Sequence, residues 1–188
     1  MANIKEVEQA RSRIQNIIHK TPIVHSQSLQ EKWERRVFFK AEHLQKTGSF
    51  KIRGAANAVT NAVSNGATLV TAASSGNHGQ AVAYVANELG ISSVIVVPTD
   101  ASPAKVAAIK AYGGRVEYCG TTSAERIPHA KSLANQLSGV YIPPYDHRDI
   151  IAGQGTVGLE IVEQMPDADV IVMPVGRGGL ISGNLTAV

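Results

Sequence analysis

The sequence lacks the features of a secreted, membrane-bound or nucleic-acid-binding protein. Its 188 residues include a single cysteine, Cys119, so no disulfide can form within the chain and a reducing compartment is expected. No apolar run approaches the roughly 20 residues that a membrane helix requires, and residues 1–6 contain no apolar signal core. The net charge of +3 comes from scattered Lys and Arg residues, which does not favour nucleic-acid binding. These features predict a soluble cytoplasmic protein.

What the sequence does contain is an alternation of strand and helix patterns. The composition, 44% hydrophobic and 18% charged, is typical of a globular domain. Asn3 with Glu6 predicts a capping pair at a helix start, and Ser102 with Pro103 predicts another. Such alternation favours a doubly wound, mostly parallel α/β sheet. The patterns predict strands at 37–42, 68–72, 93–97, 115–119, 140–142 and 169–175, and helices at 4–18, 80–89, 103–112, 124–136 and 150–165.

Lys51 stands in the segment Ser49-Phe50-Lys51-Ile52-Arg53-Gly54, at the expected start of a helix that follows strand 37–42. Partial burial and the positive end of the helix dipole both lower the pKa of a lysine amine. An amine that forms an imine with an aldehyde requires such a lowered pKa. Taken alone, the pattern is more typical of a solvated lysine in a first helical turn.

Two further loops follow expected strands. Ser74-Ser75-Gly76-Asn77-His78-Gly79 lies after strand 68–72, at the end of a parallel strand where ligands bind. Its hydroxyls, amide and free N–H groups suit a carboxylate, although His78 by itself is more typical of a structural hydrogen bond. The loop 175–183, Val-Gly-Arg-Gly-Gly-Leu-Ile-Ser-Gly, follows strand 169–175 and offers backbone N–H groups to a phosphate. The alternative for the first loop is a polar loop that only caps the next helix, and the alternative for the second is a flexible turn.

A fourth pattern has a different explanation. Residues 153–158, Gly-Gln-Gly-Thr-Val-Gly, match the dinucleotide-binding pattern G-x-G-x-x-G. No convincing strand precedes them, and the flanking apolar residues predict that they lie inside a helix. A dinucleotide-binding module is therefore not favoured.

In this order, the lysine segment, the Ser-Ser-Gly-Asn-His-Gly-Gln loop, Ala-Gly-Gln-Gly-Thr at 152–156 and the glycine loop resemble one group of enzymes. The chain is similar to the amino-terminal portion of fold-type II pyridoxal-phosphate enzymes, close to threonine/serine dehydratases and serine racemases. The resemblance implies a three-layer, tryptophan-synthase-β-like α/β fold. It divides the chain into a small domain, 69–146, and an incomplete large cofactor domain, 1–68 with 147–188.

The same resemblance implies a role for each matching residue. Lys51 would bind pyridoxal 5'-phosphate as a Schiff base and act as a general base, with Ser75 as a second catalytic residue. The cofactor would be bound by Phe50, Lys51, Asn77, Gly176, Gly178, Gly179 and Leu180. The substrate would be bound by Ser74, Ser75, Gly76, Asn77, His78 and Arg126.

The implied reaction is loss of the β-hydroxyl of L-threonine or L-serine, which gives a 2-oxo acid and ammonia. Serine racemisation is the alternative if Ser75 returns a proton to the opposite face. A non-catalytic module that folds around 69–146 and dimerises is another. The expected partners are a small hydroxy-amino acid and a second copy of the chain.

Two features depart from the family pattern. Arg177 replaces a glycine of the phosphate loop. The chain also stops at Val188, before the later strands of the large domain, the side chain that faces the pyridine nitrogen and the metal-binding acidic residues of the family, so no metal site is expected.

Overall fold

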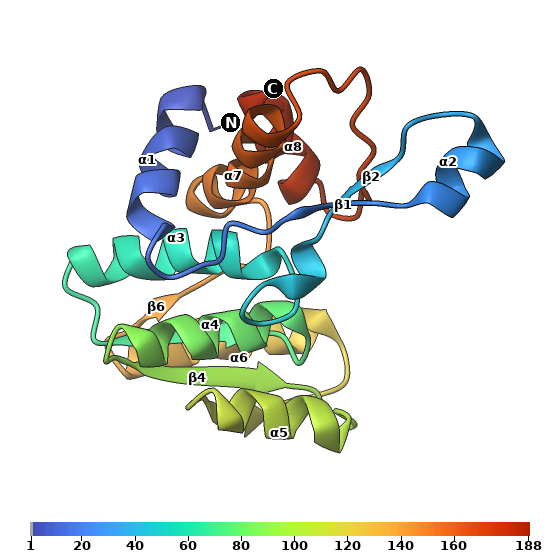
Figure 1. Cartoon of the computed structure of the whole chain (residues 1–188). Helices are drawn as coiled ribbons and strands as arrows, with labels where there is room; N and C mark the ends of the chain where they lie inside the picture. Colours follow the sequence, from blue (N-terminus) through green and yellow to red (C-terminus); the bar gives the residue numbers. More distant parts are fainter. Residues whose placement is uncertain (1) are drawn as a thin grey trace.

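The computed structural model describes residues 2–188, and its elements alternate as the sequence predicts from residue 69 to residue 164 (Figure 1). The first part contains two short strands and three α-helices. The second contains a parallel sheet, and the last contains two helices. In chain order the elements are α1 (Ile4–Ile14), β1 (Ile23–His25), α2 (Gln27–Trp33), β2 (Phe38–Lys40), the 3-10 helix η1 (Glu42–Leu44), α3 (Lys51–Ser64), β3 (Leu69–Ala73), α4 (Asn77–Glu88), β4 (Ser92–Val97), α5 (Pro103–Ala111), β5 (Arg115–Tyr118), α6 (Ser123–Gln136), β6 (Val140–Tyr141), α7 (Arg148–Gln164) and α8 (Gly179–Ala187).

A four-stranded parallel sheet forms the centre of the lower half of the molecule in Figure 1. Its order is β5-β4-β3-β6, with Thr71 paired to Val94 on one side and to Tyr141 on the other. Helices α4 and α5 pack together on one face, and α6 packs against β3, β4 and β6 on the other. This arrangement confirms the three-layer, doubly wound α/β fold.

The order of the strands reverses at β3. The chain runs outward from β3 to β4 and β5, then returns through α6 to place β6 on the opposite side of β3. The loops at the carboxyl ends of β3 and β6 therefore diverge there, which is where open α/β sheets form ligand crevices. The Ser74–Gly76 loop leaves β3 at this point.

Helix α3 connects the sheet half to the remaining helices. It packs between α4 and α7, and α1 and α8 pack on α7 (Figure 1). Small residues along α3 make this close packing possible, since Ala55, Ala56 and Val59 are all fully buried. One hydrophobic core runs from α1 through α3 to the sheet, so the start of α3 is held from both sides.

The segment 153–158 lies within α7, as the sequence predicts. A Cβ at Gly153 would stand 2.6 Å from the Arg53 carbonyl oxygen of α3, and one at Gly155 would stand 2.6 Å from the Gly183 carbonyl oxygen of α8. The glycines therefore allow three helices to approach backbone to backbone. Helix packing explains the pattern that resembles a dinucleotide fingerprint.

Two boundaries differ by more than two residues from the sequence-based prediction. The first helix begins with the predicted Asn3–Glu6 capping box but ends at Ile14 rather than residue 18. The helix predicted at 80–89 starts earlier, at Asn77, because Gly76 serves as its N-cap and residues 77–79 form its first turn. The loop that follows β3 is correspondingly short.

The strand predicted at 169–175 is wrong. The segment is not a strand, because no part of residues 2–188 pairs with it, and a strand needs a hydrogen-bonded neighbour. Val170 and Val172 are 77% and 90% exposed.

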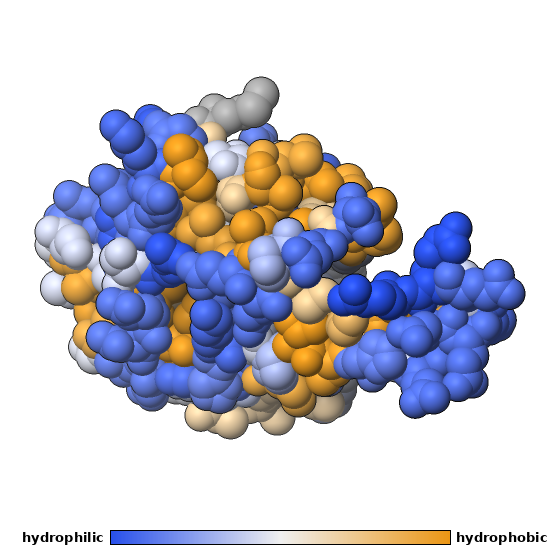
Figure 2. All heavy atoms as spheres, turned by 45° about the horizontal axis from the view of Figure 1, so that its top comes forward, coloured by the Kyte–Doolittle hydropathy of each residue, from blue (hydrophilic) through white to orange (hydrophobic). Residues whose placement is uncertain are grey.

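Figure 2 shows apolar atoms gathered on the side of the molecule that carries the carboxyl-terminal segment, whereas the projecting α2 region is hydrophilic. Among the described residues, no helix has both the length and the apolar character needed to cross a membrane.

Candidate active site

Lys51 is the first residue of α3, at the position that the sequence predicts. Its Nζ donates a hydrogen bond of 2.7 Å to the Pro144 carbonyl oxygen and lies 5.6 Å from the centre of the Phe50 ring. Burial lowers the pKa of the Lys51 amine below its ordinary value. The amine therefore loses its proton more readily than an exposed lysine does.

A cavity of about 220 Å³ opens beside Lys51. Its walls come from three separate parts of the chain: the start of α3, the segment before α7 with the first half of that helix, and the glycine loop before α8. The lining residues are Phe50, Lys51, Pro144, Tyr145, Ile150, Gln154, Pro174, Gly176, Arg177, Gly178, Gly179, Leu180 and Ile181. The predicted cofactor lysine and the predicted phosphate loop thus meet in one cavity.

The glycine loop ends in the N-cap of α8. Gly178 takes φ +82°, the left-handed region that glycine tolerates best, and Gly179 begins the helix. Arg177 does not have a positive φ, so the residue that replaces a glycine causes no backbone strain there. The first-turn N–H groups of α8 have no partner within the helix and are directed toward its amino-terminal end.

The second predicted motif approaches the same region from β3. The buried imidazole of His78 donates from Nε2 to the Ile142 carbonyl oxygen at 3.0 Å. Burial, together with a smaller effect of the nearby Lys51 charge, lowers the pKa of His78 to about 4. Lys51 and His78 therefore bind the same short segment, residues 142–144, from two directions. The His78 side chain binds this segment, whereas the His78 backbone N–H lies in the first turn of α4.

The other predicted substrate residues occupy different surroundings. Ser74 and Ser75 are half-buried, Asn77 is exposed at the start of α4, and none of them lines the 220 Å³ cavity. Arg126 lies in the first turns of α6, with Nε and Nη1 buried and without a hydrogen-bond partner among residues 2–188. The structure thus gathers the predicted cofactor residues around one cavity with the exception of Asn77, which lies outside the cavity lining together with the predicted substrate residues.

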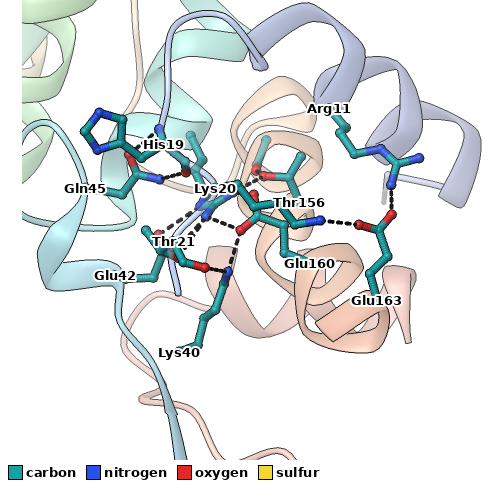
Figure 3. A network of polar contacts seen from close by, with 12 residues as sticks. Arg11, His19, Lys20, Thr21, Lys40, Glu42, Gln45, Thr156, Glu160 and Glu163 are labelled. Atoms are coloured by element: carbon teal, nitrogen blue, oxygen red, sulfur yellow. Dashed lines mark hydrogen bonds and ion pairs between the residues drawn. The ribbon is translucent and has the colours of Figure 1, made fainter. Parts of the chain in front are cut away.

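A buried ionic network supports the start of α3 (Figure 3). Arg53, two residues after Lys51, is fully buried and donates to Glu42 at 2.7 and 2.8 Å and to Glu160 at 2.7 and 2.9 Å. Lys40 completes the set with a 2.5 Å contact to Glu160. Two cations and two anions therefore balance inside the protein, which a buried charge requires.

The network favours the ionised form of Glu160. Burial alone would raise the pKa of Glu160, but hydrogen bonds from Arg53 and Lys40 outweigh it and hold that pKa below the usual range. The sequence motifs give no role to Arg53, Glu42 or Glu160. The one sign of this buried network in the sequence is the arginine among the small apolar residues of the helix at 52–59.

The cavity has the chemistry of an anion site. It is lined by the cations Lys51 and Arg177, by no acidic residue and by the amino-terminal end of α8. Gln154, only 1% exposed, also lines it, and its Oε1 has no hydrogen-bond partner among the described residues. A buried acceptor of this kind is satisfied by a donor outside the chain, either a water molecule or an N–H or O–H of a ligand. These residues fit a cofactor that carries an aldehyde and a phosphate.

The fold and this cavity define a fold-type II pyridoxal-phosphate enzyme. Residues 14–188 match the family described as "Pyridoxal-phosphate dependent enzyme", so the chain belongs to that family. Among residues 2–188, no group of three or more His, Cys, Asp or Glu side chains is placed to hold a metal ion.

The chain is similar to both kinds of enzyme that the sequence resembles. It is 43% identical over 184 residues to the serine racemase of Dictyostelium discoideum, covering 96% of this chain and 56% of that protein. It is 39% identical over 189 residues to the L-threonine ammonia-lyase of Thermotoga maritima, covering 100% of this chain and 47% of that protein. The structure of maize serine racemase matches 99% of the chain with a TM-score of 0.95 and 38% identity, and the chain covers 57% of it. The chain therefore spans about half the length of these relatives.

Proposed function

We propose that this chain takes part in the pyridoxal-phosphate-dependent deamination of L-threonine or L-serine to a 2-oxo acid and ammonia. The observation that carries the proposal is the single cavity that contains both the Lys51 amine and the glycine loop at the start of α8. The family and the relatives at about 40% identity support the cofactor and the amino-acid substrate class.

Lys51 would act first as the covalent anchor and then as the base. When bound, pyridoxal phosphate withdraws electrons from the substrate Cα, so that the Cα proton becomes acidic. The lowered pKa of Lys51 favours the neutral amine, which accepts that proton at Nζ. The Pro144 carbonyl oxygen orients the amine through its 2.7 Å hydrogen bond.

The remaining residues would hold the two anionic groups. The backbone N–H groups of Gly176, Gly178, Gly179 and Leu180 would bind the phosphate at the start of α8, and Phe50 lies beside the lysine. Ser74, Ser75 and Gly76, with Asn77 and the His78 backbone N–H, would hold the substrate carboxylate at the start of α4. Arg126 would provide a further cation.

Serine racemisation is the second candidate. Several relatives at 39–43% identity are serine racemases, which favours this activity as much as deamination. It requires a proton donor on the face of the substrate opposite Lys51, and we propose the Ser75 hydroxyl for that role. Replacement of Ser75 by Ala should then abolish racemisation while β-elimination continues.

The test combines a spectrum with product assays. We expect the chain to give a visible absorbance band with pyridoxal phosphate, and borohydride should attach the cofactor to the peptide that contains Lys51. The Lys51→Ala variant should lose the band, and the control Lys110→Ala, at an exposed lysine of α5, should keep it. Release of 2-oxo acid from L-serine or L-threonine, and of D-serine from L-serine, separates the two activities. No band with the unmodified chain would contradict both and favour a non-catalytic module.

We also propose the division into domains 69–146 and 1–68 with 147–188, a homodimer and a cytoplasmic location. The four-stranded sheet falls entirely within residues 69–146, which supports the first proposal. Limited proteolysis tests the division, and light scattering tests the dimer. The unpaired Cys119 fits a reducing compartment.

A further inference from the structure

Arg177 is the side chain that sets this phosphate loop apart. It lies in the loop between Gly176 and Gly178, lines the same cavity as Lys51, and has its guanidinium 5.2 Å from the centre of the Tyr145 ring. No carboxylate within residues 2–188 forms a salt bridge with it. A cation held on an aromatic face and without an anionic partner is available to a ligand.

Two other features of the cavity point to a bound ligand. The N-cap of α8 directs unpaired backbone N–H groups toward an anion, and α8 is nine residues long. Independently, Gln154 is 1% exposed and lines the cavity with its Oε1, a hydrogen-bond acceptor, unpartnered, so the cavity also suits a ligand that carries a hydrogen-bond donor. An arginine fork matches the oxygens of a phosphate better than a lysine ammonium does.

We propose that Arg177 binds the phosphate of the cofactor through its guanidinium and that Tyr145 positions it by stacking. The inference rests on the proposed cofactor function and adds a side-chain contact to a phosphate site otherwise made of backbone N–H groups. Cofactor affinity in this protein therefore has an ionic component that an all-glycine loop lacks. The ligand class is a phosphate monoester, and the dephosphorylated aldehyde, pyridoxal, gains nothing from Arg177.

The experiment measures the dissociation constants of pyridoxal 5'-phosphate and of pyridoxal for the unmodified chain and for Arg177→Ala, Arg177→Gly and Arg177→Lys. We expect Arg177→Ala and Arg177→Gly to weaken pyridoxal phosphate binding about tenfold, the effect of roughly one charge-assisted hydrogen bond in a partly exposed site. Arg177→Lys should lose less, and pyridoxal binding should not change. Raising the salt concentration should weaken binding to the unmodified chain more than to Arg177→Ala.

Arg115→Ala is the matched control, because it removes the same charge from an exposed position on β5. It should leave both dissociation constants unchanged. Equal pyridoxal phosphate affinity in Arg177→Gly and the unmodified chain would overturn the inference while leaving the proposed function intact. Equal losses of pyridoxal and pyridoxal phosphate affinity would also overturn it, because Arg177 would then act on the fold rather than on the phosphate.

Inorganic phosphate distinguishes the inference from the proposed function. If the chain forms no covalent link with pyridoxal phosphate, the proposed function fails, and calorimetric titration with inorganic phosphate then tests Arg177 alone. Binding that weakens in Arg177→Ala and not in Arg115→Ala would support the phosphate contact. Absence of phosphate binding by the unmodified chain, or binding that is insensitive to Arg177, would refute it. Binding of a dicarboxylic amino acid that depends on Arg177 while phosphate binding does not would reassign the arginine to the substrate.

Discussion

We expect His78 to make the stability of the fold depend on pH between about 6.5 and about 4. Its imidazole is buried and donates from Nε2 to the Ile142 carbonyl oxygen, and burial favours the neutral ring in the folded state. Burial lowers the pKa from 6.5 to about 4. The unfolded chain therefore binds a proton first as the pH falls, and stability decreases over that window.

The magnitude follows from the size of the shift. At about 1.4 kcal/mol for each pKa unit, the difference corresponds to roughly 3 kcal/mol of unfolding free energy, lost progressively from pH 6.5 downward. Most of this loss should occur above pH 4.5, where carboxylates whose pKa is lowered by partners, such as Glu163, remain ionised. A loss of stability above pH 4.5 therefore reports protonation of His78 rather than protonation of the acidic residues.

Urea unfolding at pH 7, 6, 5 and 4.5 measures this loss. His78→Gln keeps a donor that can reach the Ile142 carbonyl oxygen but removes the titration, so its stability should change little over the same range. His25→Gln, at an exposed position of β1, serves as the control and should behave as the unmodified chain. A His78→Gln variant that loses stability as steeply as the unmodified chain would refute the reasoning.

Three further changes test other parts of the structure. Arg53→Met should lower the unfolding free energy by about 3–5 kcal/mol, because it leaves Glu42 and Glu160 with unpaired buried charge. The control Arg148→Met, on the surface, should cost less than about 1 kcal/mol, and urea unfolding at pH 7 compares the two variants. Gly155→Ala should lower the melting temperature, with a cost of about 1–3 kcal/mol from the clash with the Gly183 carbonyl oxygen, and a rise in melting temperature would contradict the packing. Reductive methylation followed by mass spectrometry should modify Lys51 at a lower pH than the exposed Lys110, because burial lowers the Lys51 pKa; identical pH profiles would argue against an activated amine.

The parallel sheet could be predicted from the sequence because each strand is a short β-branched run bounded by its own turn residues. β4, for example, was expected at 93–97 and spans Ser92–Val97. The segment 169–175 has the same local pattern and is not a strand, because pairing depends on a neighbour that local sequence does not specify. The end of α4 was likewise predicted better than its start, since Gly76 gives no strong capping signal.

The parts of the site that lie within a single sequence motif could be predicted. Lys51 and the glycine loop were identified as separate segments, and the structure brings them to one cavity. Pro144 belongs to none of the predicted motifs, although its carbonyl oxygen accepts the Lys51 hydrogen bond. Arg53 with Glu160 was missed because the two residues are 107 positions apart, and a salt bridge of that kind has no local pattern.

The helix contacts at Gly153 and Gly155 have an evolutionary consequence. Neither glycine lines the cavity beside Lys51, and both are required by the backbones of the neighbouring helices. Selection for the proposed cofactor site and selection for a folded chain therefore act on different residues of this protein. A descendant that lost the proposed site but still folded would be free to change Lys51 long before it could change Gly155.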